Sequence, residues 1–179
     1  MRKHTSAGFT LIELMVVISI IGVLSSIVMS TFTQARAKAR DASRQASMHT
    51  IVTALQEYYL EYGCLPITQG TTICGPATGT YSDANAGDWD YSSQGGFLGF
   101  LVTAGVLKKV PVDPTNNMTG DAVPSGTYAF RYYCYPSAWD RGVHLGYWSE
   151  TTGEDVSVIP QIAGDWQTPS WSDPSFVCK

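Results

Sequence analysis

Residues 9–32 read FTLIELMVVISIIGVLSSIVMSTF, 24 consecutive positions with one charged residue. As an α-helix this stretch would be about 36 Å long, which is enough to cross a bilayer core of roughly 30 Å. Arg2 and Lys3 precede it, so the positive-inside rule places the N-terminus in the cytoplasm and the rest of the chain outside. The sequence therefore predicts a single-pass transmembrane helix in the inner (cytoplasmic) membrane.

A cleaved secretory signal is the first alternative for this segment. Such a signal has a shorter apolar region that is followed by a small-residue cleavage site. No site of that kind follows Phe32, and Arg36, Lys38 and Arg40 come soon after it, as they would in a continuing helix. A plain, uncleaved signal anchor stays open as an interpretation.

The charged residue within the apolar stretch is Glu13. A carboxylate inside a membrane helix costs about 2.5–3.5 kcal/mol on insertion scales, and such residues are functional candidates. No Lys or Arg within the stretch can pair with it, so we expect its partner to come from another chain or from a chain terminus. The alternative is that Glu13 lies near enough to the cytoplasmic face to reach water.

The helix is predicted to continue through residues 33–62, because that range contains neither Pro nor Gly. Small and apolar residues recur there mostly at spacings of three and four, which predicts an amphipathic helix that packs on a globular domain. The predicted packing stripe consists of Ala35, Ala39, Ala42, Ala46, Ile51, Leu55, Tyr58 or Tyr59, and Tyr62. Gly63 fits the position just after a helix end.

Residues 63–179 are predicted to form an extracytoplasmic globular head. They carry five Lys or Arg and eleven Asp or Glu, a net charge of −6. Such a charge repels phosphate backbones, so no direct nucleic-acid binding is predicted. Residues 64–96 are rich in turn formers and predict loops, whereas residues 97–109 predict a short helix with Phe97, Leu101, Ala104 and Leu107 on one side.

Aromatic and β-branched residues near the end of the chain predict three short strands, at residues 127–135, 143–149 and 156–159. We expect them to form a small antiparallel sheet packed against the second half of the long helix. The predicted fold class is therefore α+β.

All four cysteines, Cys64, Cys74, Cys134 and Cys178, lie in the predicted head. An even number on one side of a membrane segment fits disulfides in an oxidising compartment. Short loop closure favours Cys64–Cys74, which leaves Cys134–Cys178. A zinc site is the alternative, but there is no C-x-x-C pair and no His next to a Cys.

The stretch KHTSAGFTLIELMVVISIIGVL, from Lys3, resembles the class III signal sequence of type IV prepilins and the related pseudopilins. The resemblance implies a leader peptide of residues 1–8, cut between Gly8 and Phe9 by a prepilin peptidase, and N-methylation of Phe9. It also implies that Glu13 serves filament assembly by meeting the N-terminal amine of a neighbouring subunit. A pilin-like fold and an inner-membrane assembly platform follow from the same resemblance.

The resemblance predicts a structural subunit of a type IV pilus-like filament, with copies of itself and related pilins as partners. The alternative is a type II secretion pseudopilin in a short periplasmic pseudopilus. The VPVDP motif at residues 110–114 resembles the connection after the second helix of major pseudopilins, whereas two disulfides and an acidic, loop-rich head favour an exposed pilus. From another class, a signal-anchored extracellular enzyme is the outsider.

Enzymatic motifs are absent from the sequence: there is no G-x-S-x-G, Walker A or G-x-G-x-x-G pattern, and the three histidines, His4, His49 and His144, lie far apart. We therefore expect neither catalysis nor a cofactor.

Calcium is the one metal that the sequence leaves open. Asp83, Asn85, Asp88 and Asp90 lie in DANAGDWD, but the glycine and the final glutamate of an EF-hand loop are out of place. A polar turn is the preferred interpretation. Glu154, Asp155 and Asp165 form a second loose group without a matching motif.

Overall fold

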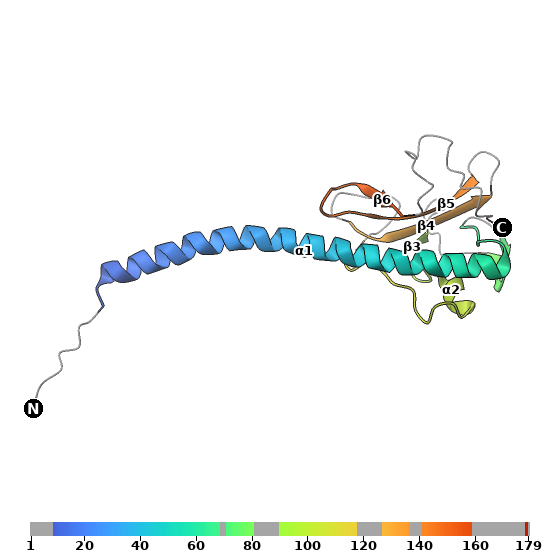
Figure 1. The fold of residues 1–179 in the computed structure, drawn as a ribbon, viewed down its shortest axis with the longest axis horizontal. Coiled ribbons are helices and arrows are strands. Elements are labelled where there is room, and N and C mark those ends of the chain that lie inside the picture. The colour runs from blue at the N-terminus through green and yellow to red at the C-terminus, as the bar shows by residue number, and fades with distance from the viewer. Residues whose placement is uncertain are drawn as a thin grey trace, which may run out of the picture. The chain divides into compact units, whose positions relative to one another are not determined.

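The computed structural model describes residues 9–68, 71–80, 90–117, 127–136, 141–158 and 178 of the 179-residue chain. The chain divides into two compact units, Met1–Ala39 and Arg40–Lys179, and each is described by itself. One helix, α1 (Leu11–Tyr62), runs through both (Figure 1). The prediction of one long N-terminal helix is confirmed, with its first residue at Leu11 rather than Phe9.

α1 ends where the sequence predicts. Gly63 has a φ of 66°, and its N–H donates to the carbonyl oxygen of Tyr59 at 2.8 Å. A left-handed residue just after a helix is readily supplied by glycine, which has no Cβ to clash. The chain therefore turns away immediately after Tyr62.

The second unit contains a four-stranded antiparallel sheet in the order β3 (Asp90–Tyr91), β4 (Phe130–Pro136), β5 (Arg141–Trp148) and β6 (Asp155–Ser157). The three strands predicted near the chain end are confirmed as β4, β5 and β6, with ends that differ by a few residues. The sheet supports the predicted α+β, pilin-like fold.

Two strands form a hairpin in the range predicted as loops. β1 (Thr71–Cys74) pairs with β2 (Ala77–Thr80), and Gly75 and Pro76 make the two-residue turn. Half of the residues in these four-residue strands are Thr, and the strands carry too little hydrophobic alternation to be recognised. The two-residue strand β3 was missed for the same reason.

One face of the second half of α1 builds the core of the head. It carries Met48, Ile51, Leu55 and Tyr58, all fully or almost fully buried. The Tyr58 ring contacts Phe100 with a centroid distance of 5.0 Å, and Phe100 in turn lies 5.9 Å from the ring of Tyr132 on β4. The core therefore joins α1, the segment around Phe100 and the sheet.

The prediction that the alanines of α1 pack on the head is wrong. Ala42 and Ala46 are exposed, as are Ala35 and Ala39 in the first unit, whereas Ile51, Leu55 and Tyr58 are buried as predicted. The buried face continues instead through Asp41 and Arg44, two charged residues that a hydrophobic pattern cannot reveal.

The short helix of the head is also shorter than predicted. α2 covers Gly99–Thr103, five residues within the predicted 97–109. Leu98 before it and Gly105 after it have φ values of 47° and 77°, which a right-handed helix cannot contain. Phe97 and Leu101 are nonetheless buried, as the predicted apolar side requires.

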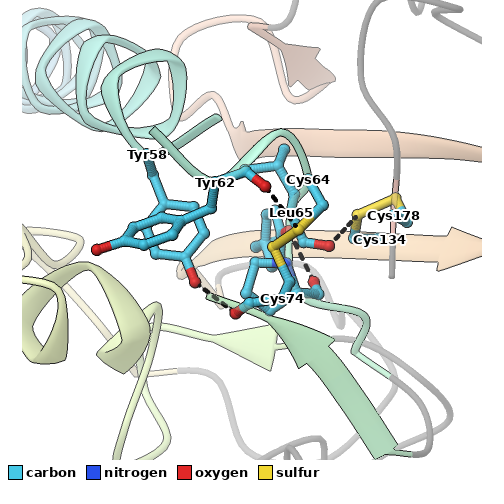
Figure 2. The surroundings of a disulfide bond; sticks show 9 residues. Tyr58, Tyr62, Cys64, Leu65, Cys74, Cys134 and Cys178 are labelled. Atoms are coloured by element: carbon cyan, nitrogen blue, oxygen red, sulfur yellow. Dashed lines mark hydrogen bonds between the residues drawn. A yellow bond between two sulfur atoms is a disulfide. The ribbon is translucent and has the colours of Figure 1, made fainter. Parts of the chain in front are cut away.

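Both disulfides lie close to the end of α1 (Figure 2). Cys64 is bonded to Cys74, and Cys134 on β4 is bonded to Cys178, the pairing favoured by loop length. Leu65 forms an isolated parallel bridge with Cys178. The chain segment just after α1 and the penultimate residue of the chain are therefore held side by side.

Candidate assembly site

The first unit presents its large apolar side chains to its surroundings. From Phe9 to Phe32 every described Leu, Ile, Val, Met and Phe is about half or more exposed, with Phe9 at 87% and Leu11 at 76%. By length and composition this part of α1 is suited to cross a membrane. Large exposed apolar surfaces of this kind mark sites of contact with lipid or with another protein.

Glu13 is held by the residue three positions before it. Its Oε2 accepts hydrogen bonds from the backbone N–H and the hydroxyl of Thr10, both at 2.8 Å, and the Glu13 N–H donates to the Thr10 hydroxyl at 3.4 Å. This reciprocal arrangement is a helix capping box, with Thr10 as N-cap. It also satisfies donors that have no partner within the helix.

The capping box gives Glu13 hydrogen-bond partners in its own chain, whereas the expected cationic partner in another chain or at a terminus stays a prediction. The sequence signal for this contact is a Ser or Thr three residues before a Glu at the start of an apolar run, which Thr10 and Glu13 satisfy. The carboxylate still lacks a positive partner among the described residues of the first unit. Thr10 therefore positions the Glu13 carboxylate but does not neutralise its charge.

The proposed processing site is only half described. Gly8 lies outside the described residues, and Phe9 and Thr10 precede the first helical residue, Leu11.

A buried charge cluster lies between α1 and two loops of the head. The Arg44 side chain is fully buried, and its guanidinium donates to Asp113 at 2.7 and 3.1 Å, to Asp41 at 2.7 Å and to Glu150 at 2.6 Å. The Tyr128 ring lies 4.8 Å from the guanidinium carbon, within range of a cation–π contact. Three carboxylates thus surround one cation.

Hydrogen bonds from the loop after β5 complete this cluster. Asp41 accepts from the Ser149 hydroxyl at 2.8 Å, from the Thr151 hydroxyl at 2.7 Å and from the backbone N–H of Glu150 at 3.1 Å. Arg40 adds a second cation, donating from Nε to Glu150 at 2.8 Å. A buried ion cluster is tolerated only when its polar atoms are satisfied in this way.

The cluster shifts the pKa values of its members. Burial alone would raise the pKa of Asp41, but the hydrogen bonds from Thr151, Glu150 and Arg44 hold it well below its usual range. The hydrogen bond from Arg40 lowers the pKa of Glu150, and Arg44 adds to that effect. Both carboxylates therefore stay charged at neutral pH.

Sequence reasoning missed this cluster. From the sequence, no role was assigned to Arg44 or Asp41, and Asp113 was considered only as part of the VPVDP motif. The available signal was their spacing of three residues, which places Asp41 and Arg44 on one side of a helix.

The structure describes only some of the calcium candidates, so a calcium site there stays untested. Asp83, Asn85 and Asp88 lie outside them, as does Asp165 of the second group. Asp90 is buried and accepts a hydrogen bond from the backbone N–H of Leu98 at 2.9 Å. Asp155 pairs with Arg131. Within the described ranges no group of three or more His, Cys, Asp or Glu side chains is arranged to hold a metal ion.

An open groove of about 470 Å³ lies between α1 and the edge of the sheet. It is lined by Gln45, His49 and Val52 of α1 and by Tyr147, Val156, Ser157 and Val158. The groove contains one imidazole, His49, and one aliphatic hydroxyl, Ser157, and these two described side chains form no hydrogen bond with each other.

Comparison with known families agrees with the N-terminal pattern. Residues 3–29 match the family described as Prokaryotic N-terminal methylation motif. The chain is 30% identical over 119 residues to Type II secretion system core protein G of Pseudomonas aeruginosa, which covers 65% of this chain and 73% of that protein.

Two pilins also match shorter stretches. Type IV major pilin protein PilE1 of Neisseria gonorrhoeae is 34% identical over 71 residues, covering 40% of this chain and 33% of its own. Type IV major pilin protein PilA of Myxococcus xanthus is 35% identical over 54 residues, covering 30% and 24%. No solved structure gives a significant match.

Proposed function

Because the chain belongs to the family of type IV pilins and type II secretion pseudopilins, and is a structural subunit of a pilus or pseudopilus, we propose that it is made as a precursor and polymerises through its N-terminal helix. In this proposal residues 1–8 are the leader, a prepilin peptidase cuts between Gly8 and Phe9, and Phe9 is N-methylated. The anchor holds the subunit in the inner membrane, N-terminus in the cytoplasm, until an assembly platform adds it to the filament.

The observation that carries the proposal is the combination of an exposed apolar helix with one carboxylate at its start. The side chains from Leu11 to Phe32 can be covered by lipid before assembly and by equivalent helices afterwards. Cleavage removes Arg2 and Lys3, the cytoplasmic charges that favour retention in the membrane. Transfer from lipid to a bundle of identical helices then exposes no apolar surface.

Cleavage also creates an amine at Phe9, a cation where the chain had none. Glu13 is already oriented toward the start of the helix by Thr10, so it can meet the amine of a neighbouring copy. Pairing removes much of the cost of burying the carboxylate. Neighbours in any other register would leave both charges unpaired, so the pair selects one register. This function requires neither catalysis nor a cofactor.

Mass spectrometry of the mature protein tests the processing. We expect the first residue to be Phe9, carrying one methyl group. A mature N-terminus at Met1, or at any residue other than Phe9, would refute the proposal.

Replacement of Glu13 by Gln tests its role in assembly. We expect the variant to be inserted and cleaved but to give at least about tenfold fewer filaments, because the amine loses its counter-charge. Glu154→Gln, an exposed residue of the head, is the matched control and should assemble normally. Wild-type filament yield from Glu13→Gln would contradict the pairing.

Use in secretion is the second candidate for the filament. It is favoured by the match to a type II secretion core protein over 73% of that protein's length. Deletion of the gene distinguishes the two uses. Loss of surface filaments with normal export of secreted proteins indicates a pilus, whereas loss of protein secretion indicates a pseudopilus.

A further inference from the structure

The outer side of α1 near its end carries an acidic and apolar patch. It consists of Glu57, Leu60 and Glu61, and Leu60 is 86% exposed. Neither glutamate forms an ion pair with any described residue. A large leucine held in water between two carboxylates gains nothing from the fold of its own subunit, so this acidic patch is suited to a partner.

A second segment of the head has the opposite charge. The basic segment consists of Val102, Lys108, Lys109 and Val112; both lysines are exposed, and the two valines are 42% and 43% exposed. Every arginine of the head whose side chain is described, namely Arg40, Arg44 and Arg131, forms an ion pair. Among the described lysines and arginines of the head, Lys108 and Lys109 therefore form no ion pair and can bind an external anion.

We propose that the acidic patch of one copy docks on the basic segment of a neighbouring copy. This inference rests on the proposed function, because it needs subunits that are held side by side. The two surfaces match in charge, with two carboxylates facing two ammonium groups, and in character, with Leu60 facing the exposed valines. Opposite charges at matching positions favour the correct register and disfavour others.

The two surfaces are different parts of one chain, so the contact is heterologous. A heterologous contact that does not close on itself continues as a helical filament. Each exposed ion pair is individually weak, but the contact recurs at every subunit. Burial of Leu60 between the pairs excludes water and strengthens them.

Charge reversal tests the complementarity. Glu57→Lys with Glu61→Lys places four cations together and should lower filament yield about tenfold, and Lys108→Glu with Lys109→Glu should do the same. The chain with all four reversals has the wild-type net charge and should recover most of the yield. Glu154→Lys, which reverses an exposed acid elsewhere in the head, is the matched control and should leave the yield unchanged.

Cross-linking tests proximity. No free cysteine exists in the described chain, so Leu60→Cys combined with Val112→Cys should give a ladder of disulfide-linked multimers in oxidised filaments. Each single variant should give no ladder beyond dimers. Thr53→Cys combined with Val112→Cys is the matched control, because Thr53 is also exposed on α1 but lies outside the acidic patch.

The outcomes separate this contact from the proposed function. Recovery by the fourfold reversal together with the Leu60–Val112 ladder supports the contact. Normal filaments from each reversed pair, no recovery, or an equal loss in Glu154→Lys overturns it and leaves the filament function intact. A wild-type chain whose N-terminus is not Phe9 and which forms no filaments overturns both.

Discussion

At the scale of single residues, Arg44 determines how the second half of α1 is attached to the head. Its guanidinium ties Asp41 of the same helix to Asp113 and Glu150 in two separate loops. An apolar residue at this position could pack but could not orient three carboxylates. Removing one partner from a buried ion cluster leaves uncompensated charge, which costs far more than an exposed ion pair.

Arg44→Met should therefore lower the free energy of unfolding of the head by about 3–5 kcal/mol. Urea unfolding of the full chain in detergent, followed by tryptophan fluorescence, measures this change. The matched control is Arg40→Met, whose side chain is 40% exposed and whose loss should cost about 1 kcal/mol or less. Equal losses in the free energy of unfolding would show that the buried position of Arg44 adds nothing to the strength of its ion pairs.

His144 makes the head sensitive to mild acid. Burial on β5, with a smaller effect of the Arg131 charge, lowers the pKa of His144 to about 3. The unfolded chain, with an ordinary histidine pKa of about 6.5, binds the proton first as the pH falls. Stability is therefore fully present above about pH 6.5 and decreases toward pH 3, with a limiting slope of about 1.4 kcal/mol per pH unit.

Urea unfolding measured between pH 7 and pH 4.5 checks this behaviour. His144→Gln should flatten the slope in that window, whereas the exposed His49→Gln should leave it unchanged. The lowered pKa values of Asp41 and Glu150 add acid sensitivity below about pH 5, where unfolded carboxyl groups begin to take up protons. A slope that survives in His144→Gln would assign the effect to another group.

At the scale of elements, the β1–β2 hairpin is fitted closely to the end of α1. Gly75 in its turn has a φ of 60°, and a Cβ atom there would lie 2.7 Å from the Tyr58 hydroxyl oxygen and 2.7 Å from Cγ of Tyr62. The Tyr58 hydroxyl donates to the carbonyl oxygen of Cys74 at 2.7 Å (Figure 2). The turn therefore needs glycine both for its backbone angle and for space.

Gly75→Ala should lower the free energy of unfolding by about 2–4 kcal/mol, the sum of left-handed strain and overpacking. Gly105→Ala is the matched control, because Gly105 also has a positive φ, 77°, but has no atom within 4 Å of the added Cβ. That control should cost only the backbone strain, about 1–2 kcal/mol. The difference in the free energy of unfolding between the two variants measures the cost of the close contact at Gly75. Equal losses would mean that the hairpin shifts away from Tyr58 and Tyr62 at no cost.

Elements were predictable from sequence where one physical pattern is strong. The apolar run and the absence of Pro and Gly in 33–62 predicted α1 to within two residues, and the aromatic alternation around Tyr132 predicted β4. The hairpin and β3 could not be predicted, because their strands are short. β3 is held by its pairing with β4, and the hairpin by its own pairing and the Cys64–Cys74 bond. The packing face of α1 was assigned to the alanines because the true face includes the charged pair Asp41 and Arg44.

At the scale of the whole molecule, the two disulfides constrain the unfolded chain to different extents. Cys64–Cys74 spans 10 residues, whereas Cys134–Cys178 spans 44. Loop-closure entropy predicts contributions of about 3 and about 4 kcal/mol respectively. The bond that holds the chain end to β4 should therefore matter more.

Paired Cys→Ser variants test this order. Cys134→Ser with Cys178→Ser should lower the urea midpoint of the head more than Cys64→Ser with Cys74→Ser. Each double variant is the control for the other, since both remove one bond and leave no free thiol. The reverse order would show that local packing around Cys64 and Cys74 outweighs chain entropy.

The start of α1 has a further consequence for maturation. A helix must unwind locally before a peptidase can reach a peptide bond inside it. Unwinding is unfavourable within a membrane, because the exposed backbone groups find no water there to form hydrogen bonds. Here Thr10 caps the helix and Leu11 begins it, so the bond between Gly8 and Phe9 precedes the capped turn. Cleavage of the proposed leader would therefore open no hydrogen bond of the α1 helix.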